Sequence, residues 1–351
     1  MVRATIRARN FDDPQRVLSL AELGAQAARL GNKDGGAKLA HEATDMAGKW
    51  VVTEQREWQI AELAKAVAQV DVSAALGIAQ KIGKQRRGDC LANIAMQLDD
   101  AAEVEKVVKD CDAWYANRAR GRVAFRIAAK RPAEAVKLVE GMPADYGRGE
   151  LTRAAAFGWL ASVIAPKDPK LAHRLIDRSF AVYLHPADPT QYMAGERAAL
   201  PALLAVHARM AGYPDMESVI ARVMATRVTM KNTWSPVAVQ ESSVASAMLL
   251  ALVDRRLAKD MLQAVEPNSD AIGSGCCGIG ACEWFNAWAL VDPLHAAEVI
   301  ERHFAAPKDD NARQYAWYAA QEAVDLWKSD PDGILERLVR NYSNIFSPYE
   351  R

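Results

Sequence analysis

The sequence has no apolar run that approaches the roughly 20 residues a helix needs to cross a bilayer. Its opening residues, MVRATIRARNFDD, lack the apolar core of a secretory signal peptide. A membrane-spanning protein and a secreted precursor are therefore not expected, and the sequence predicts a cytoplasmic location.

Net charge is also absent, because 44 basic side chains balance 44 acidic ones. Such a chain has no overall attraction to nucleic acid or to anionic lipid, so any binding of that kind has to be local. Cysteine is scarce, and the five cysteines are too few and odd in number for the disulfide framework of a small secreted domain. We expect reduced thiols.

The familiar catalytic motifs are missing as well. The chain contains no phosphate-binding P-loop, no dinucleotide fingerprint after a predicted strand, no GxSxG nucleophile elbow and no HExxH zinc motif. Its six histidines are scattered. The sequence therefore predicts no catalytic residues, no metal and no cofactor, and it favours a protein that is not an enzyme.

A recurring phrase is present instead. A helix-starting residue is followed by apolar side chains four, seven and eight positions later, with arginine at the seventh position in two of the copies, and successive starts lie 29 to 47 residues apart. This interval is typical of helical-hairpin arrays, in which each unit buries its apolar face against its neighbours. The eight starts are Asp71, Asp100, Arg131, Asp168, Asp215, Asp254, Asp292 and Asp330. They predict an all-α fold, an α-solenoid forming a right-handed superhelix of about eight to nine antiparallel helical pairs.

Each start is expected to open the second helix of a pair. Aspartate is a good N-cap because its carboxylate accepts hydrogen bonds from the free amides of the first turn. The apolar positions then follow a helical stripe. Two examples are Ala75, Ile78, Ala79 and Ile82, and Ala135, Leu138, Val139 and Met142. We expect these residues in the core.

The first helix of each pair carries an Ile-Ala phrase, at Ile60-Ala61, Ile94-Ala95 and Ile127-Ala128. An Arg-Gly step recurs upstream of it, at Arg87-Gly88, Arg120-Gly121 and Arg148-Gly149. Because glycine favours helix ends, we predict that these steps lie in the linkers between pairs.

No change of composition divides the chain, so residues 1–351 are predicted to form a single domain. Residues 1–55 fit the repeat least well and are expected to form an atypical capping unit, residues 56–266 regular repeats, and residues 267–351 a Gly/Cys loop followed by C-terminal repeats.

Period and pattern resemble those of the tetratricopeptide and HEAT-like bacterial helical-repeat families over roughly residues 16–345. The Trp and Gly-Tyr landmarks of the tetratricopeptide signature are absent from their fixed places. The resemblance implies a superhelix that binds a partner, and it carries over no catalytic residues.

Three connections exceed the two to eight residues usual between packed helices: 184–195, 228–239 and 267–281. Each joins one pair to the next, so in a solenoid they emerge on the same edge and form a candidate binding site, although unconstrained surface loops remain an alternative. The candidate residues there are Tyr192, Trp234, Cys276, Cys277 and Cys282. An enzyme or a metal or thiol site at 267–282 stays open as an alternative.

Basic residues are concentrated at 81–131, where twelve basic side chains face seven acidic ones. We expect Arg86 and Arg87 in one connection and Arg118 and Arg120 in the next, which together form a positive ridge for an acidic peptide or for nucleic acid. The alternative is that these cations complement the negative C-terminal ends of helices.

The leading interpretation is a non-enzymatic scaffold that binds a protein or peptide through its concave face and its connecting loops. Nucleic-acid binding by the basic ridge is a further alternative. The sequence does not predict an oligomeric state.

Overall fold

The computed structural model describes residues 14–53, 56–142, 147–184, 194–231, 243–244, 246–265 and 287–305. All regular secondary structure within these ranges is helical. No helix among them has the length and apolar character needed to span a bilayer. The chain divides into two compact units, Met1–Pro143 and Ala144–Arg351, which we call unit 1 and unit 2 and describe separately.

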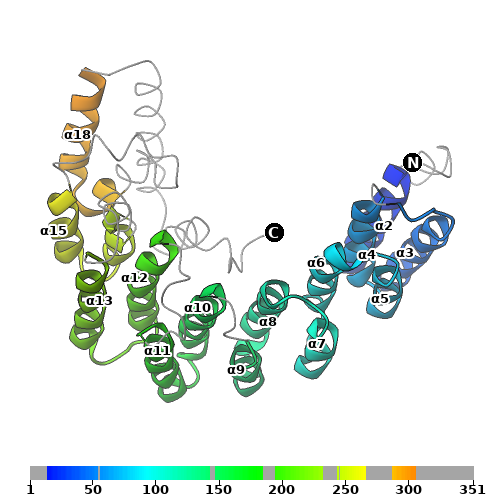
Figure 1. Ribbon diagram of the computed structural model, residues 1–351, viewed down its shortest axis with the longest axis horizontal. Coiled ribbons are helices and arrows are strands. Elements are labelled where there is room, and N and C mark those ends of the chain that lie inside the picture. Colours follow the sequence, from blue (N-terminus) through cyan, green and yellow to red (C-terminus); the bar gives the residue numbers. More distant parts are fainter. Residues whose placement is uncertain are drawn as a thin grey trace. The chain divides into compact units, whose positions relative to one another are not determined.

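The described residues of unit 1 form a series of four helical hairpins (Figure 1). Its helices are α2 (Pro14–Arg29), α3 (Lys33–Ala47), α4 (Glu57–Ala68), α5 (Val72–Ala79), α6 (Lys84–Ala95), α7 (Ala101–Val108), α8 (Ala113–Ala128) and α9 (Pro132–Glu140). The first helices α2, α4, α6 and α8 pack successively against one another, and each also packs against the helix that follows it. The predicted pairing of neighbouring helices is therefore confirmed in unit 1.

Aspartate side chains start the second helices, as the repeated phrase predicts. Oδ1 of Asp71 accepts a hydrogen bond from Ala74 N at 2.9 Å, and Oδ1 of Asp100 accepts one from Ala102 N at 2.8 Å. Four of the other predicted starts cap helices in the same way: Asp168, Asp215, Asp254 and Asp292. Arg131 occupies the N-cap of α9 without a side-chain capping bond, and Asp330 lies outside the described residues.

The predicted apolar stripe is fully buried in two of the second helices, whereas in α7 Val107 is only half-buried. In α5 and α9 every stripe position is buried, and the largest exposed fraction among them is 5 %, at Ile78. The stripe of α5 joins a continuous core that runs through the first hairpins of unit 1 and includes Val17, Leu20, Ala43, Leu63, Ala75, Ile82 and Ile94. Burial of apolar area against the neighbouring hairpin is thus the main force that holds unit 1 together.

The Arg-Gly steps are not linkers, and that prediction was wrong. Arg87-Gly88 lies inside α6, Arg120-Gly121 inside α8 and Arg148-Gly149 inside α10 (Gly147–Ile164). Gly88 serves close packing instead, because a Cβ there would lie 3.2 Å from the ring of Tyr115 on α8. The helix-breaking tendency of glycine is overridden by tertiary contact.

Residues 1–55, the predicted capping unit, contain α2 and α3, which form a hairpin packed on α4. The two helices cross at Gly24 and Gly36: a Cβ on Gly24 would lie 2.9 Å from Gly36 O, and one on Gly36 would lie 2.7 Å from Gly24 O. The close backbone approach needs glycine at both positions.

We therefore expect Gly24→Ala to lower the free energy of unfolding by about 1–3 kcal/mol, because overpacking outweighs the helix preference of alanine. Gly77→Ala on α5 is the matched control, since a Cβ there meets nothing within 4 Å. It should raise stability by roughly 0.5–1 kcal/mol. Urea unfolding followed by circular dichroism measures both, and equal shifts of the same sign would contradict the close crossing.

Unit 2 contains α10, α11 (Pro169–Leu184), α12 (Ala194–Met210), α13 (Met216–Lys231), α15 (Arg255–Val265) and α18 (Pro293–Ala305). Helix α12 packs against α10, α11 and α13, and residues 201–208 of α12 are all buried. Residues 154–161 of α10 are also buried on every side. These two helices therefore form the centre of the described part of unit 2.

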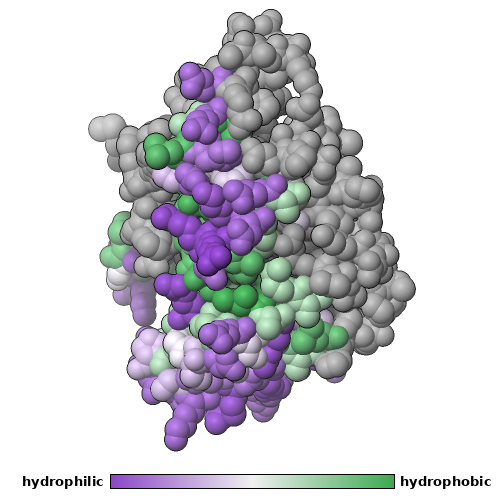
Figure 2. All heavy atoms as spheres, turned by 90° about the vertical axis from the view of Figure 1, so that its left-hand side faces the viewer, coloured by the Kyte–Doolittle hydropathy of each residue, from purple (hydrophilic) through white to green (hydrophobic). Residues whose placement is uncertain are grey.

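Figure 2 shows the side of unit 2 that carries α13, α15 and α18, where hydrophilic residues cover much of the described surface with apolar ones between them. This distribution is expected of helices that turn one apolar stripe toward their neighbours. The predicted loop 228–239 begins later than expected, because α13 continues to Lys231. Whether the two units form one continuous stack, as the single-domain prediction requires, stays a prediction.

Candidate functional site

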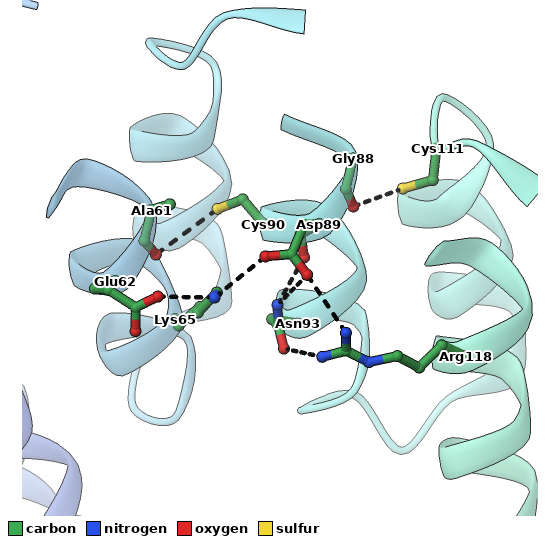
Figure 3. A network of polar contacts seen from close by, with 9 residues as sticks. All are labelled: Ala61, Glu62, Lys65, Gly88, Asp89, Cys90, Asn93, Cys111 and Arg118. Carbon is green, nitrogen blue, oxygen red and sulfur yellow. Dashed lines mark hydrogen bonds and ion pairs between the residues drawn. The ribbon is translucent and has the colours of Figure 1, made fainter. Parts of the chain in front are cut away.

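The best-defined polar arrangement lies on α4, α6 and α8, the first helices of three successive hairpins (Figure 3). Lys65 on α4 contacts Asp89 on α6, with Nζ and Oδ2 3.2 Å apart. Arg118 on α8 reaches the same carboxylate from the other side, with Nη1 and Oδ1 3.5 Å apart. Asp89 therefore links three hairpins, and we call this set of contacts the Asp89 network.

Hydrogen bonds fix the geometry of the Asp89 network. Asn93, one turn after Asp89, donates from Nδ2 to Asp89 O at 2.8 Å and to Asp89 Oδ1 at 3.1 Å, and its Oδ1 accepts a bond from Arg118 Nη2 at 3.0 Å. Glu62 Oε1 accepts a bond from Lys65 Nζ at 2.8 Å. Since the charged groups of Lys65, Asp89 and Arg118 each have more than one partner, these side chains are held in one arrangement instead of moving independently.

The electrostatics of the network favour the charged form of Lys65. Burial alone lowers the pKa of Lys65, but the hydrogen bond to Glu62 and the charges of Asp89 and Glu62 outweigh it, so the pKa of Lys65 lies above its ordinary value. The side chains of Lys65, Asp89 and Arg118 keep 28 %, 32 % and 24 % of their surface exposed. The network is consequently a water-accessible surface with fixed charges.

Two cysteines flank the network and play a different role. Burial raises the pKa of Cys90 to about 12, and burial also raises the pKa of Cys111 to about 11. The Cys90 thiol faces Ala61 O at 3.9 Å and the Cys111 thiol faces Gly88 O at 3.4 Å (Figure 3). Both thiols are protonated at neutral pH, which makes them small packing groups between hairpins and poor nucleophiles.

The sequence places Arg86 and Arg87 in a connection, but both lie in the first turn of α6. The guanidinium of Arg87 turns back onto the preceding helix pair: its Nε and Nη2 donate to Ile82 O at 3.0 and 2.7 Å. Arg87 therefore satisfies carbonyls just after α5, as the helix-end alternative predicts. Arg86 is exposed.

Arg118 and Arg120 lie in the middle of α8, so the prediction of a connection there was wrong. Arg118 belongs to the Asp89 network. Arg120 forms a two-point contact with Glu105 on α7, at 2.8 Å from Nε and 2.7 Å from Nη2, and only 11 % of its side chain is exposed. Arg126 is likewise engaged, with Asp99 at 3.0 Å. Arg118 and Arg120 are thus neutralised by carboxylates within unit 1, whereas Arg87 binds backbone carbonyls.

The remaining predicted site residues, Tyr192, Trp234, Cys276, Cys277 and Cys282, lie outside the described residues. The alternative of an enzyme or a thiol site at 267–282 lies there too. In the described part of the chain, no group of three or more His, Cys, Asp or Glu side chains is placed to hold a metal ion.

Sequence reasoning found Arg118 but missed Lys65, Asp89 and Asn93. These residues do not occupy one register of the repeat: Lys65 follows its Ile-Ala phrase, whereas Asp89 and Arg118 precede theirs by different distances. A search of the sequence for repeated patterns therefore cannot identify these residues. Only the packing of α4, α6 and α8 brings them together.

Comparison of the chain with protein families, with curated proteins and with solved structures found no match. The geometry of the described residues is therefore the basis for a functional proposal.

Proposed function

We propose that the hairpins continue as an α-solenoid, a right-handed superhelix of about eight to nine pairs, and that this protein is a non-enzymatic scaffold for a protein or peptide partner. The hairpin packing in unit 1 and the recurrence of aspartate-capped second helices in both units support the repeat architecture. The tetratricopeptide or HEAT-like character and the cytoplasmic location stay predictions.

The Asp89 network carries the binding proposal. It spans three hairpins and presents both charges and an amide in a fixed, water-accessible array. A partner that contacts this array does not have to order it, so less conformational entropy is lost on binding. We expect the row of first helices, α2, α4, α6 and α8, to form the concave face of the superhelix.

Nucleic-acid binding by the ridge at 81–131 has less support. Affinity for a phosphate backbone depends on several unpaired cations that displace counterions. Arg87, Arg118 and Arg120 are already bound to carbonyls or carboxylates of unit 1. The positive potential that remains is too local for a polynucleotide, which favours a protein or peptide ligand.

A peptide selection tests the proposal. Random peptides displayed on phage are selected on the full chain, and the affinities of the enriched peptides are measured for variants by fluorescence anisotropy. We expect Lys65→Met to weaken the binding about tenfold or more, because it removes a charge from the network and frees Asp89 on one side.

Lys106→Met is the matched control. Lys106 pairs with Glu103 three positions earlier on α7, just as Lys65 pairs with Glu62 on α4, but Lys106 lies on a second helix. Lys106→Met should change the affinity for the selected peptides by less than about twofold. Failure to enrich any peptide, or equal losses in the two variants, would refute binding by the row of first helices.

A further inference from the structure

A second surface lies where α4 and α6 begin. It combines an exposed basic cluster, Lys81, Lys84 and Arg86, with an exposed apolar patch, Val51, Val52 and Trp58. The exposed fractions of the apolar side chains are 73 %, 42 % and 47 %, respectively. Large apolar side chains this exposed mark interaction surfaces when they are grouped beside charges.

The two halves of this surface are adjacent. Glu57 opens α4 immediately before Trp58, and its Oε1 accepts a hydrogen bond at 2.8 Å from the backbone N–H of Gly83, which directly precedes Lys84. Figure 1 shows α4 and α6 side by side. The starts of the two helices are therefore joined. Trp58 lies on α4 and follows Val51 and Val52 in the chain, whereas Lys84 and Arg86 lie on α6 and follow Lys81.

The cations of the cluster form no ion pair with the part of the chain that the structure describes. Within the described residues, no carboxylate lies within ion-pair distance of Lys81, Lys84 or Arg86, unlike Arg118, Arg120 and Arg126. Lys84 and Arg86 also stand in the first turn of a helix that has no acidic residue there, a position where positive side chains are unfavourable. A negatively charged ligand relieves both effects.

We propose that this surface binds a short acidic segment of a partner protein that also carries a large apolar side chain. The apolar side chain covers Val51, Val52 and Trp58, and the carboxylates pair with Lys84 and Arg86. Neighbouring packed helices lie about 8–10 Å apart, and an extended chain advances about 3.3 Å per residue. The acidic residues should therefore lie about three positions from the apolar one.

A peptide fits this surface better than a nucleic acid. Three cations provide few phosphate contacts, and the carboxylate of Glu57 lies beside Gly83 at the same helix start, whereas strong binding to a polynucleotide depends on many such contacts. The half made of Val51 and Val52 offers aliphatic contacts, which suit a leucine or phenylalanine of a peptide.

The inference rests on the proposed partner-binding function but concerns a different surface from the Asp89 network. The probe is a short fluorescein-labelled peptide with two leucines followed, three positions on, by a run of glutamates. Its fluorescence anisotropy is measured with the full chain. Two parallel probes are the same peptide with glutamines in place of the glutamates and a fluorescein-labelled single-stranded oligouridylate.

We expect the glutamate peptide to bind and the glutamine peptide to bind at least about tenfold more weakly, with an affinity that falls as salt is raised. Arg86→Glu should weaken the glutamate peptide about tenfold or more, and Trp58→Ala should weaken it several-fold. Lys130→Glu, the same type of charge reversal at an exposed position between α8 and α9, should change the affinity less than twofold. Circular dichroism verifies that each variant keeps its helicity.

Absence of binding by the glutamate peptide overturns the inference, as does equal binding of the glutamine peptide. Equal losses for Arg86→Glu and Lys130→Glu also overturn it, because they indicate a non-specific charge effect. If oligouridylate binds more tightly than the glutamate peptide and depends on Arg86, the ligand of this surface is a nucleic acid and not a peptide. A further outcome separates this inference from the proposed function. If Lys65→Met weakens the phage-selected peptides but the glutamate peptide does not bind, this inference is wrong and the proposed scaffold function is still supported.

Discussion

Leu138→Glu is expected to unfold the α8–α9 hairpin at neutral pH and to destabilise the hairpin packed next to it. Leu138 lies on the inward stripe of α9 and is 1 % exposed. Loss of its buried apolar surface costs about 2–5 kcal/mol, and a buried carboxylate without a partner adds several kcal/mol more. The sum is comparable with the whole stability of a typical domain, about 5–15 kcal/mol.

Lys137→Glu is the control for this prediction, because it introduces the same side chain one position earlier at an exposed site. The urea midpoint of Leu138→Glu should fall far below that of Lys137→Glu. Burial raises the pKa of the new carboxyl in the folded state, so the unfolded state releases its proton first and the destabilisation should shrink as pH is lowered toward about 4. Equal midpoints for the two variants would show that the stripe is not buried.

Acid should destabilise unit 2 through His207. This histidine lies on α12, is fully buried, and packs against Trp159 of α10 with ring centroids 4.3 Å apart and the ring planes tilted by 58°. Both ring nitrogens are without hydrogen-bond partners in the described structure. Burial lowers the pKa of His207 to about 3, because the apolar surroundings disfavour the charged imidazolium.

The direction of this pH effect on stability follows from the number of protons that the folded and unfolded states bind. In the unfolded chain the imidazole takes up a proton near pH 6.5, whereas in the folded chain it does so only near pH 3. Between these values the unfolded state binds more protons, so the free energy of unfolding decreases by up to about 1.4 kcal/mol for each pH unit below 6.5. At pH 5 the loss from His207 amounts to roughly 2 kcal/mol.

Hydrogen exchange measured by mass spectrometry on peptides from α10 and α12 tests this expectation at pH 7 and pH 5. The protection of these peptides should fall at pH 5 in the natural protein, after correction for the intrinsic exchange rate. His207→Phe should remove most of that fall, and His41→Gln, at an exposed position of unit 1, should not. A pH response that is unchanged in His207→Phe would assign the acid sensitivity to other groups.

The elements that sequence reasoning predicted correctly are those controlled by local chemistry. Asp71 and Asp100 start helices because their carboxylates cap the first turn, and this depends only on residues two or three positions away. The apolar stripe of α9 is buried because its spacing matches the helical period. A single sequence contains all the residues on which such short-range interactions depend, so it is enough to predict them.

The errors arise where tertiary contact decides. Gly88 was predicted to end a helix, but the nearby ring of Tyr115 explains why glycine stands within α6. Arg120 was predicted to be a free cation of a loop, but Glu105 on the neighbouring helix neutralises it. Asp89 was not recognised, because Lys65 and Arg118 approach it only after three hairpins have packed. Part of the candidate site therefore could not be predicted from the periodic patterns of the sequence.

The packing order in unit 1 has a kinetic consequence. Each helix contacts mainly the next one or the next but one along the chain, so the mean sequence separation of interacting residues, the contact order, is short. Little loop-closure entropy is lost before native contacts form, and rapid folding is favoured. During synthesis, α2 to α5 are able to pair on the ribosome before α8 and α9 emerge, which limits the time that apolar stripes remain available for aggregation.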